Sequence, residues 1–300
     1  MSQSLPPLRI VAFNMFPPAY EGVATWAASR GHKIVLLVTL PGGGEGRYGE
    51  SPHLASLVPP EQDVLVSKRL KTTVPAVVRA MEPDLIISAT FAKRIPPVVT
   101  EIPRYGALNF HPAPLPRGRG PNPQRVIYEG DQTTAVTLHR IVPEFDAGAI
   151  LSQPTLPLPD AITPEFVLGS WLTMLHDALD EGVARAVAGD FGTVQDESQA
   201  TYAAPFTPEE LVLNWDEPAL TVQRRATALN LVGPHAQAML DGRLVTVQDV
   251  HAVPDSPRAV PGTILERTGD LRIVRVADTA VQMTIVAETE PAHQEAVTLA

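Results

Sequence analysis

The chain has 300 residues, of which 44% are hydrophobic and 19% charged, and it carries a formal net charge of −10 and no cysteine. This length and apolar content suffice for one large domain or two smaller ones with packed cores. The composition excludes disulfides and thiolate metal sites, and no apolar stretch reaches the ~18 residues of a membrane span.

The first residues lack the basic and apolar regions of a signal peptide, so we expect a cytoplasmic protein. Strand-like runs then alternate with helical patterns. The candidate strands are 9–13, 33–38, 84–88, 106–110 and 134–141. A short helix is expected over 21–30, ended by Gly31, and the longest helical pattern covers 163–188. This alternation predicts an α/β domain with a Rossmann-like, mostly parallel sheet and helices on both faces.

One glycine motif follows the second candidate strand. Gly44-x-Gly46-x-x-Gly49 formally matches a dinucleotide fingerprint, but it does not follow the first strand, and the start of a helix after it is weak. We expect a flexible surface loop here. The eight histidines show no metal-ligand spacing, so we predict no required metal.

The end of candidate strand 106–110 carries polar side chains. Residues i and i+2 of a strand point to one side, so Asn109 and His111 should face the same pocket. Pro112 ends the strand and begins a loop rich in proline and glycine. With Asp146, which follows 35 residues after His111, they offer a carboxamide, an imidazole and a carboxylate for oxyanion stabilisation and proton transfer. Singly, each is more often structural.

The pattern changes beyond the long helix. A polar, turn-rich segment over 190–207 predicts a linker between domains 1–189 and 208–300. After it come a helix at 217–230 and several short strands without long helices between them, which suggest a small β-barrel. These candidate strands are 236–240, 243–250, 262–265, 271–276 and 281–286.

Four motifs in sequence resemble those of the 10-formyltetrahydrofolate-dependent formyltransferases. They are Asn-x-His at 109–111, Leu-Pro-x-x-Arg-Gly-x-x-Pro at 115–123, Thr-Leu-His at 137–139 and Phe-Asp-Ala-Gly at 145–148. The first strand also resembles the first strand of this family. Three later segments resemble the C-terminal domain of the family's tRNA enzyme, namely 213–216, 228–230 and 240–242. The resemblance covers nearly the whole chain and implies an OB-like C-terminal domain.

The resemblance also implies roles for particular residues. Asn109 would stabilise the oxyanion, His111 would act as general acid and base, and Asp146 would orient His111; 10-formyltetrahydrofolate would be the co-substrate, with no metal. The family usually has His-x-Ser-Leu-Leu-Pro, whereas residues 111–116 read His-Pro-Ala-Pro-Leu-Pro, so that a hydroxyl is lost and a proline gained. By position, the residues that would line the folate site are Lys93, Arg94, Ile95, Ala113, Pro114, Leu115, Pro116, Val142, Pro143, Glu144 and Phe145.

The acceptor of the formyl group stays open at this point. Residues 206–300 hold seven arginines, no lysine and thirteen acidic residues, a net charge of −6, which disfavours tRNA because proteins that bind it cluster cationic side chains. We expect the amine or hydroxylamine of a small metabolite. The alternatives are methionyl-tRNA formyltransferase, a non-catalytic folate-binding protein and hydrolysis of the donor; the last is disfavoured because the first strand begins by residue 9, leaving no room for the regulatory domain of such relatives. The sequence does not indicate an oligomeric state or a membrane partner.

Overall fold

The structure is a computed structural model that describes residues 5–42 and 53–288. The glycine motif at 44–49 lies outside the described residues. The chain divides into two compact units, each built from segments that are apart in the sequence. The first unit comprises 1–123, 135–156 and 170–202, and the second comprises 124–134, 157–169 and 203–300.

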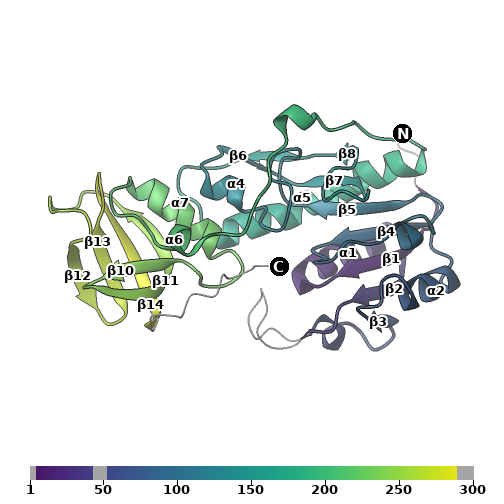
Figure 1. Cartoon of the computed structure of the whole chain (residues 1–300), viewed down its shortest axis with the longest axis horizontal. Helices are drawn as coiled ribbons and strands as arrows, with labels where there is room; N and C mark the ends of the chain where they lie inside the picture. Colours follow the sequence, from purple (N-terminus) through teal and green to yellow (C-terminus); the bar gives the residue numbers. More distant parts are fainter. Residues whose placement is uncertain (1–4, 43–52, 289–300) are drawn as a thin grey trace. The chain divides into compact units, whose positions relative to one another are not determined.

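The first unit is built on a seven-stranded sheet with strand order β3-β2-β1-β4-β5-β7-β8 (Figure 1). The five strands from β3 to β5 are parallel, and β7 and β8 add to the edge in antiparallel fashion. The predicted mostly parallel sheet is thus confirmed. The strands are β1 (Arg9–Asn14), β2 (Lys33–Thr39), β3 (Val64–Val66), β4 (Leu85–Ala89), β5 (Ala107–His111), β7 (Thr137–Arg140) and β8 (Ile150–Ser152).

Helices cover both faces of this sheet, as predicted. On one face, α2 (Thr73–Ala80) and α3 (Pro97–Thr100) bury Val74, Val78 and Val99 against Phe13 and Ile86. On the other, α1 (Pro17–Ser29) and α5 (Pro164–Val187) pack together, and the 3₁₀ turn η1 (Leu54–Ser56) contributes its leucine.

Hydrogen bonds to the Asp180 carboxylate fix the C-terminal end of α1 against α5. The indole Nε1 of Trp26 donates to Asp180 Oδ1 at 2.8 Å, and the Arg30 guanidinium pairs with the same carboxylate at 2.6 Å. Helix α1 begins four residues before the expected start, because Pro17 and Pro18 occupy the first turn, where a missing N–H costs nothing. Gly31 follows the helix with φ +71°, the left-handed conformation expected of a residue that ends a helix.

The second unit is built on a five-stranded antiparallel sheet with order β10-β11-β14-β13-β12. The β-rich C-terminal domain expected from the short strands is confirmed, and its OB-like character stays a prediction. Its strands are β10 (Gln237–Leu240), β11 (Arg243–Val253), β12 (Ile264–Thr268), β13 (Leu271–Arg275) and β14 (Ala280–Glu288). Its helices are α4 (Arg125–Tyr128), α6 (Pro208–Leu211) and α7 (Ala219–Leu229), and α7 packs on β11 through Gln223, whose Oε1 accepts from Ala252 N at 2.9 Å.

Three short elements complete the described part of the chain: β6 (Thr133–Ala135) and β9 (Thr155–Pro157), which pair as a two-stranded sheet, and the 3₁₀ turn η2 (Glu197–Gln199). The expected single strand over 134–141 is therefore wrong. It breaks at Val136, whose N–H bonds to the Pro154 carbonyl at 3.2 Å, so that β6 and β7 belong to different sheets. Across the described residues, no helix is both long and apolar enough to span a membrane.

Candidate functional site

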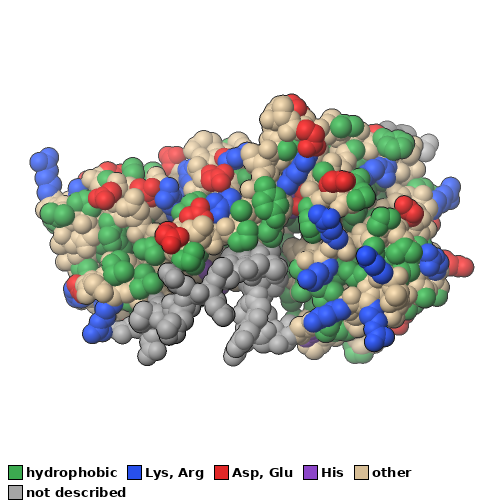
Figure 2. Space-filling model, in the orientation of Figure 1, with side chains coloured by type: hydrophobic (Ala, Val, Ile, Leu, Met, Phe, Trp, Pro, Cys, Tyr) green, Lys and Arg blue, Asp and Glu red, His purple; other side chains and the backbone are tan. Residues whose placement is uncertain are grey.

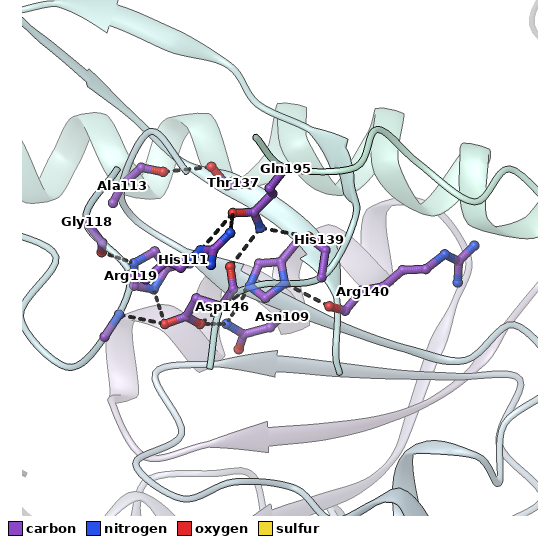
Figure 3. A network of polar contacts seen from close by, with 12 residues as sticks. Asn109, His111, Ala113, Gly118, Arg119, Thr137, His139, Arg140, Asp146 and Gln195 are labelled. Carbon is purple, nitrogen blue, oxygen red and sulfur yellow. Dashed lines mark hydrogen bonds and ion pairs between the residues drawn. The ribbon is translucent and has the colours of Figure 1, made fainter. Parts of the chain in front are cut away.

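The end of β5 carries the first two site residues. Asn109 and His111 lie in the strand itself, and Asn109 is placed directly opposite His139 of the antiparallel neighbour β7. His111 is buried, with 6% of its surface exposed, whereas Asn109 is partly exposed. Figure 3 shows both side chains turned toward Asp146. The structure therefore brings together the three residues that the sequence singled out.

His111 is held at both ring nitrogens. Its Nε2 lies 2.8 Å from the Gly118 carbonyl oxygen in the loop that follows β5. Because a carbonyl only accepts, this nitrogen carries the hydrogen. Its Nδ1 lies 3.6 Å from Asp146 Oδ2, too long for a hydrogen bond but within ion-pair range. The nitrogen able to take up a proton is thus Nδ1, beside the carboxylate.

Asp146 lies in a turn with φ +54°, a left-handed conformation that Asp tolerates better than most residues. Its Oδ2 accepts the Gly120 N–H at 2.9 Å, and its Oδ1 accepts from Asn109 Nδ2 at 3.2 Å. Burial by itself would raise the pKa of Asp146. The nearby imidazoles of His111 and His139 and the Gly120 N–H outweigh burial and hold that pKa well below its usual range, so the carboxylate stays ionised.

A second histidine, His139, completes the cluster. Its Nδ1 donates to the Arg140 carbonyl at 2.8 Å, so in the neutral ring Nε2 is an acceptor. That Nε2 lies 3.2 Å from Asn109 Nδ2 and 3.5 Å from Asp146 Oδ1. Both amide hydrogens of Asn109 are therefore engaged, one by Asp146 and one by His139. The reverse orientation of the amide would set its oxygen against the ionised carboxylate.

Sequence reasoning did not name His139 as a site residue, although the Thr-Leu-His motif contains it. Its role depends on β7 lying antiparallel beside β5, which places it opposite Asn109. Two further residues in the network of Figure 3, Arg119 and Gln195, were also missed. Arg119 belongs to a recognised motif, but nothing in the local sequence of Gln195 marks it.

The segments expected to line a folate site lie in different surroundings. Lys93 and Arg94 are exposed, and the Arg94 guanidinium lies 4.3 Å from the centre of the Phe145 ring, which is 46% exposed. Ile95 is instead buried in the hydrophobic core below α3. Val142, Pro143 and Glu144 are exposed beside Phe145.

The loop after β5 is fixed through its backbone. The Ala113 carbonyl accepts from Thr137 Oγ1 at 2.7 Å, and the Leu115 carbonyl accepts from Gln153 Nε2 at 2.8 Å. Ala113 and Leu115 are buried, whereas Pro114 and Pro116 are half-buried. In the described parts of the chain, no three His, Asp or Glu side chains are arranged to hold a metal ion.

Comparisons with known proteins agree along most of the chain. Residues 14–182 match the family described as formyl transferase, and residues 205–299 match the formyl transferase C-terminal domain. The methionyl-tRNA formyltransferase of Thiobacillus denitrificans is 32% identical over 268 residues, which cover 85% of this chain and 84% of that protein. The one of Methylococcus capsulatus is 35% identical over 199 residues; this match spans 65% of the chain and 63% of the relative.

Two solved structures share the fold. HypX from Aquifex aeolicus in complex with tetrahydrofolic acid has a TM-score of 0.68 at 20% identity, covering 93% of this chain and 44% of HypX. WlaRD, a sugar 3N-formyl transferase solved in the presence of dTDP and 5-N-formyl-THF, has a TM-score of 0.61 at 12% identity, covering 95% of this chain and all of WlaRD.

Proposed function

Because the chain belongs to the formyl transferase family, we propose that it transfers a formyl group from 10-formyltetrahydrofolate to the amine or hydroxylamine of a small metabolite in the cytoplasm. The observation that carries this proposal is the contact of a carboxamide, an imidazole and an ionised carboxylate at the end of β5. These are the groups that acyl transfer to an amine requires when no covalent enzyme intermediate forms.

Asn109 acts on the developing oxyanion. Attack of the amine on the formyl carbon places negative charge on the formyl oxygen, and an amide N–H aimed at that charge contributes ~3 kcal/mol to the transition state. The bond from Asn109 to His139 is 3.2 Å long and has a neutral acceptor. Charge-assisted bonds are stronger, so the hydrogen given to His139, rather than the one given to Asp146, is the one redirected to the substrate.

His111 moves the proton. Its Nδ1 takes a proton from the attacking amine and returns it to the folate nitrogen as the carbon–nitrogen bond of the donor breaks, so the ring ends the cycle as it began. The imidazolium formed in between is stabilised by Asp146, which remains ionised because its pKa is held low. The bond from His111 Nε2 to the Gly118 carbonyl fixes the ring, so that Nδ1 stays beside the Asp146 carboxylate.

The surface beside the cluster suits the donor substrate. The exposed ring of Phe145 precedes Asp146, and the face that the Arg94 guanidinium does not cover offers a flat apolar surface for the pterin or the aryl group. Lys93 and Arg94, both exposed, would pair with the carboxylates of the glutamate tail.

Formylation of methionyl-tRNA is the second candidate function. Two observations favour it: the names of the relatives, and an exposed cationic strip after β3 and β4. This strip consists of Lys68, Arg69, Lys71, Lys93 and Arg94, and Figure 2 shows Lys and Arg side chains gathered over this part of the first unit. Against it stands the net charge of −6 over residues 206–300, which would repel phosphates. A non-catalytic folate-binding protein would not need all three reactive side chains.

The test is an assay of formyl transfer by the purified full chain, in which the release of tetrahydrofolate is measured. Acceptors are a panel of amino sugars and modified amino acids, with charged initiator tRNA as a separate arm. We expect acceptor-dependent release with a small amine and its loss in Asn109→Ala and His111→Ala. Activity on the charged tRNA alone would establish the second candidate. Donor binding without turnover on any acceptor, unchanged in both variants, would contradict the proposal.

A further inference from the structure

Gln195, which precedes η2, has a buried and fully bonded side-chain amide. Only 5% of its surface is exposed. Its Oε1 accepts from Arg119 Nε at 3.0 Å and from Arg119 Nη2 at 2.8 Å. Its Nε2 donates one hydrogen to the Asp146 carbonyl at 2.7 Å and the other to the Gly148 carbonyl at 2.8 Å.

These bonds join the two segments that hold His111 and its partner. Arg119 lies between Gly118, whose carbonyl accepts from His111, and Gly120, whose N–H donates to the Asp146 carboxylate. The Asp146 carbonyl is fixed by Gln195 itself. One side chain thus sets the position of the loop and of the turn against each other, as the sticks in Figure 3 show.

Thr201, six residues after Gln195, forms further hydrogen bonds to the loop that follows β5. The Gly118 N–H donates to Thr201 Oγ1 at 2.9 Å, and the Arg119 N–H donates to the Thr201 carbonyl at 3.0 Å. The loop is therefore anchored at two places by residues 195–201. With Thr201 still in place, a change at Gln195 loosens the Asp146 turn without freeing the whole loop.

We propose that Gln195 is a positioning residue for formyl transfer, which holds the Asp146 turn at the distance from His111 and Asn109 that the reaction needs. This inference rests on the proposed function. The backbone of Asp146 is in the left-handed region, and two bonds from a buried amide are well suited to keep it there. Displacement of a catalytic group by ~1 Å can cost ~100-fold in rate.

The test uses two variants of the full chain. Gln195→Glu keeps the shape and the acceptor for Arg119 but loses both donated hydrogens. Gln195→Met keeps only the approximate volume. We expect kcat to fall ~100-fold in both, with KM for the donor nearly unchanged. The matched control is Glu197→Gln, which removes the negative charge of the exposed carboxylate 2.7 Å from Arg119 and should leave kcat as it is.

The pH profile separates positioning from a general loss of structure. The carboxyl group that Gln195→Glu introduces regains one donated hydrogen when it is protonated, so the ratio of kcat in this variant to that of the wild type should rise as the pH falls. The ratio for Gln195→Met should stay flat. The inference would be overturned if both variants had the kcat of the wild type. It would also be overturned if the loss of kcat matched a loss of thermal stability and the ratio of variant to wild-type kcat did not change with pH in either variant.

A second readout does not depend on turnover. Amide hydrogen exchange at Gly120 reports its bond to the Asp146 carboxylate. We expect this exchange to accelerate at least ~10-fold in Gln195→Met, while amides of β1 keep their wild-type rates. Unchanged exchange at Gly120 overturns the inference, whereas a wild-type protein without formyl transfer overturns only the proposed function.

Discussion

At the scale of single residues, the site is an ionised carboxylate between two imidazoles. Asp146 lies 3.6 Å from His111 Nδ1 and 3.5 Å from His139 Nε2, and an amide from Asn109 bridges the second pair. The two histidines have different tasks, because each is fixed by a different carbonyl. His111 presents a nitrogen for proton transfer, and His139 presents an acceptor that orients the Asn109 amide.

The orienting role of His139 is testable by substitution. In His139→Ala, the Asn109 amide keeps its bond to Asp146 but loses the acceptor that holds its other hydrogen before the substrate binds, so this hydrogen is less well oriented toward the site of the oxyanion. We expect kcat to fall ~10-fold, because the Asn109 donor would lose part of the ~3 kcal/mol by which such a donor stabilises the transition state. Steady-state kinetics of formyl transfer would measure it, with His251→Ala, an exposed histidine of β11, as the control. Equal kcat in wild type and His139→Ala would refute the role.

The depressed pKa of Asp146 makes its contribution to stability depend on pH. Since the folded-state pKa lies below the unfolded value of ~3.9, the contribution is fully present above that value and is lost as the pH falls toward the folded-state pKa. The free energy of unfolding of Asp146→Asn should therefore be lower than that of the wild type at pH 7, and the gap should narrow below pH ~4. Denaturant titrations at several pH values would show this; a gap independent of pH would speak against an ionised, stabilising Asp146.

Some of these site residues could be predicted from the sequence and others could not. Asn109 and His111 share a side because a strand repeats every two residues, and that rule is local. Asp146 was a candidate as the carboxylate of the cluster, but its role beside His111 was implied by the family resemblance, since nothing local shows that residue 146 returns to residue 111. His139 and Gln195 depend on strand pairing and on a contact across 49 residues of chain, which the sequence pattern does not contain.

At the scale of elements, the turn between β7 and β8 carries Asp146. Gly148 allows the backbone of this turn to lie close to the backbone of Arg140 at the end of β7. A Cβ on Gly148 would overlap the Arg140 carbonyl oxygen, which is backbone and cannot move aside alone. The short strand β8 and the break between β6 and β7 were not foreseen, because strands of three residues leave too little pattern. The long helix α5 was found almost to the residue, because its apolar stripe repeats over many turns.

A pair of glycine substitutions tests this turn. We expect Gly148→Ala to lower the free energy of unfolding by at least ~3 kcal/mol and to abolish formyl transfer, because the turn must open to admit the methyl group. Gly169→Ala in α5 is the matched control: nothing lies within 4 Å of the added Cβ. That change should raise stability by ~0.5–1 kcal/mol through helix propensity. Chemical unfolding of both variants measures the two effects, and a Gly148→Ala variant as stable as the wild type would show that the turn is not tightly packed.

At the scale of the whole molecule, charge is unevenly distributed along the chain. All four lysines lie within residues 33–93 of the first unit, whereas residues 206–300 carry seven arginines against thirteen acidic residues. The sequence showed that residues 206–300 are acidic, and from this we expected a small acceptor. It did not reveal the cationic strip, because Lys68 and Arg94 reach the same edge of the sheet only through the parallel arrangement of β3 and β4.

Salt dependence distinguishes the two acceptor classes. For a small amine we expect kcat/KM to change less than ~3-fold between about 50 and 200 mM salt. For tRNA bound through several phosphates, the value would fall ~1,000-fold or more over that range, because counterions are released on binding. Initial rates at graded salt give the slope directly. A steep negative slope with the best acceptor would contradict the small-metabolite assignment and favour tRNA.

The central claim is that Asn109, His111 and Asp146 act as one unit on the formyl carbonyl, and a double-mutant cycle in kcat tests it most directly. Residues that work together in one transition state show strongly non-additive losses. We predict that Asn109→Ala/His111→Ala loses about as much activity as the more damaging single variant. Losses that multiply, so that the double variant falls by the product of the two single effects, would contradict the account.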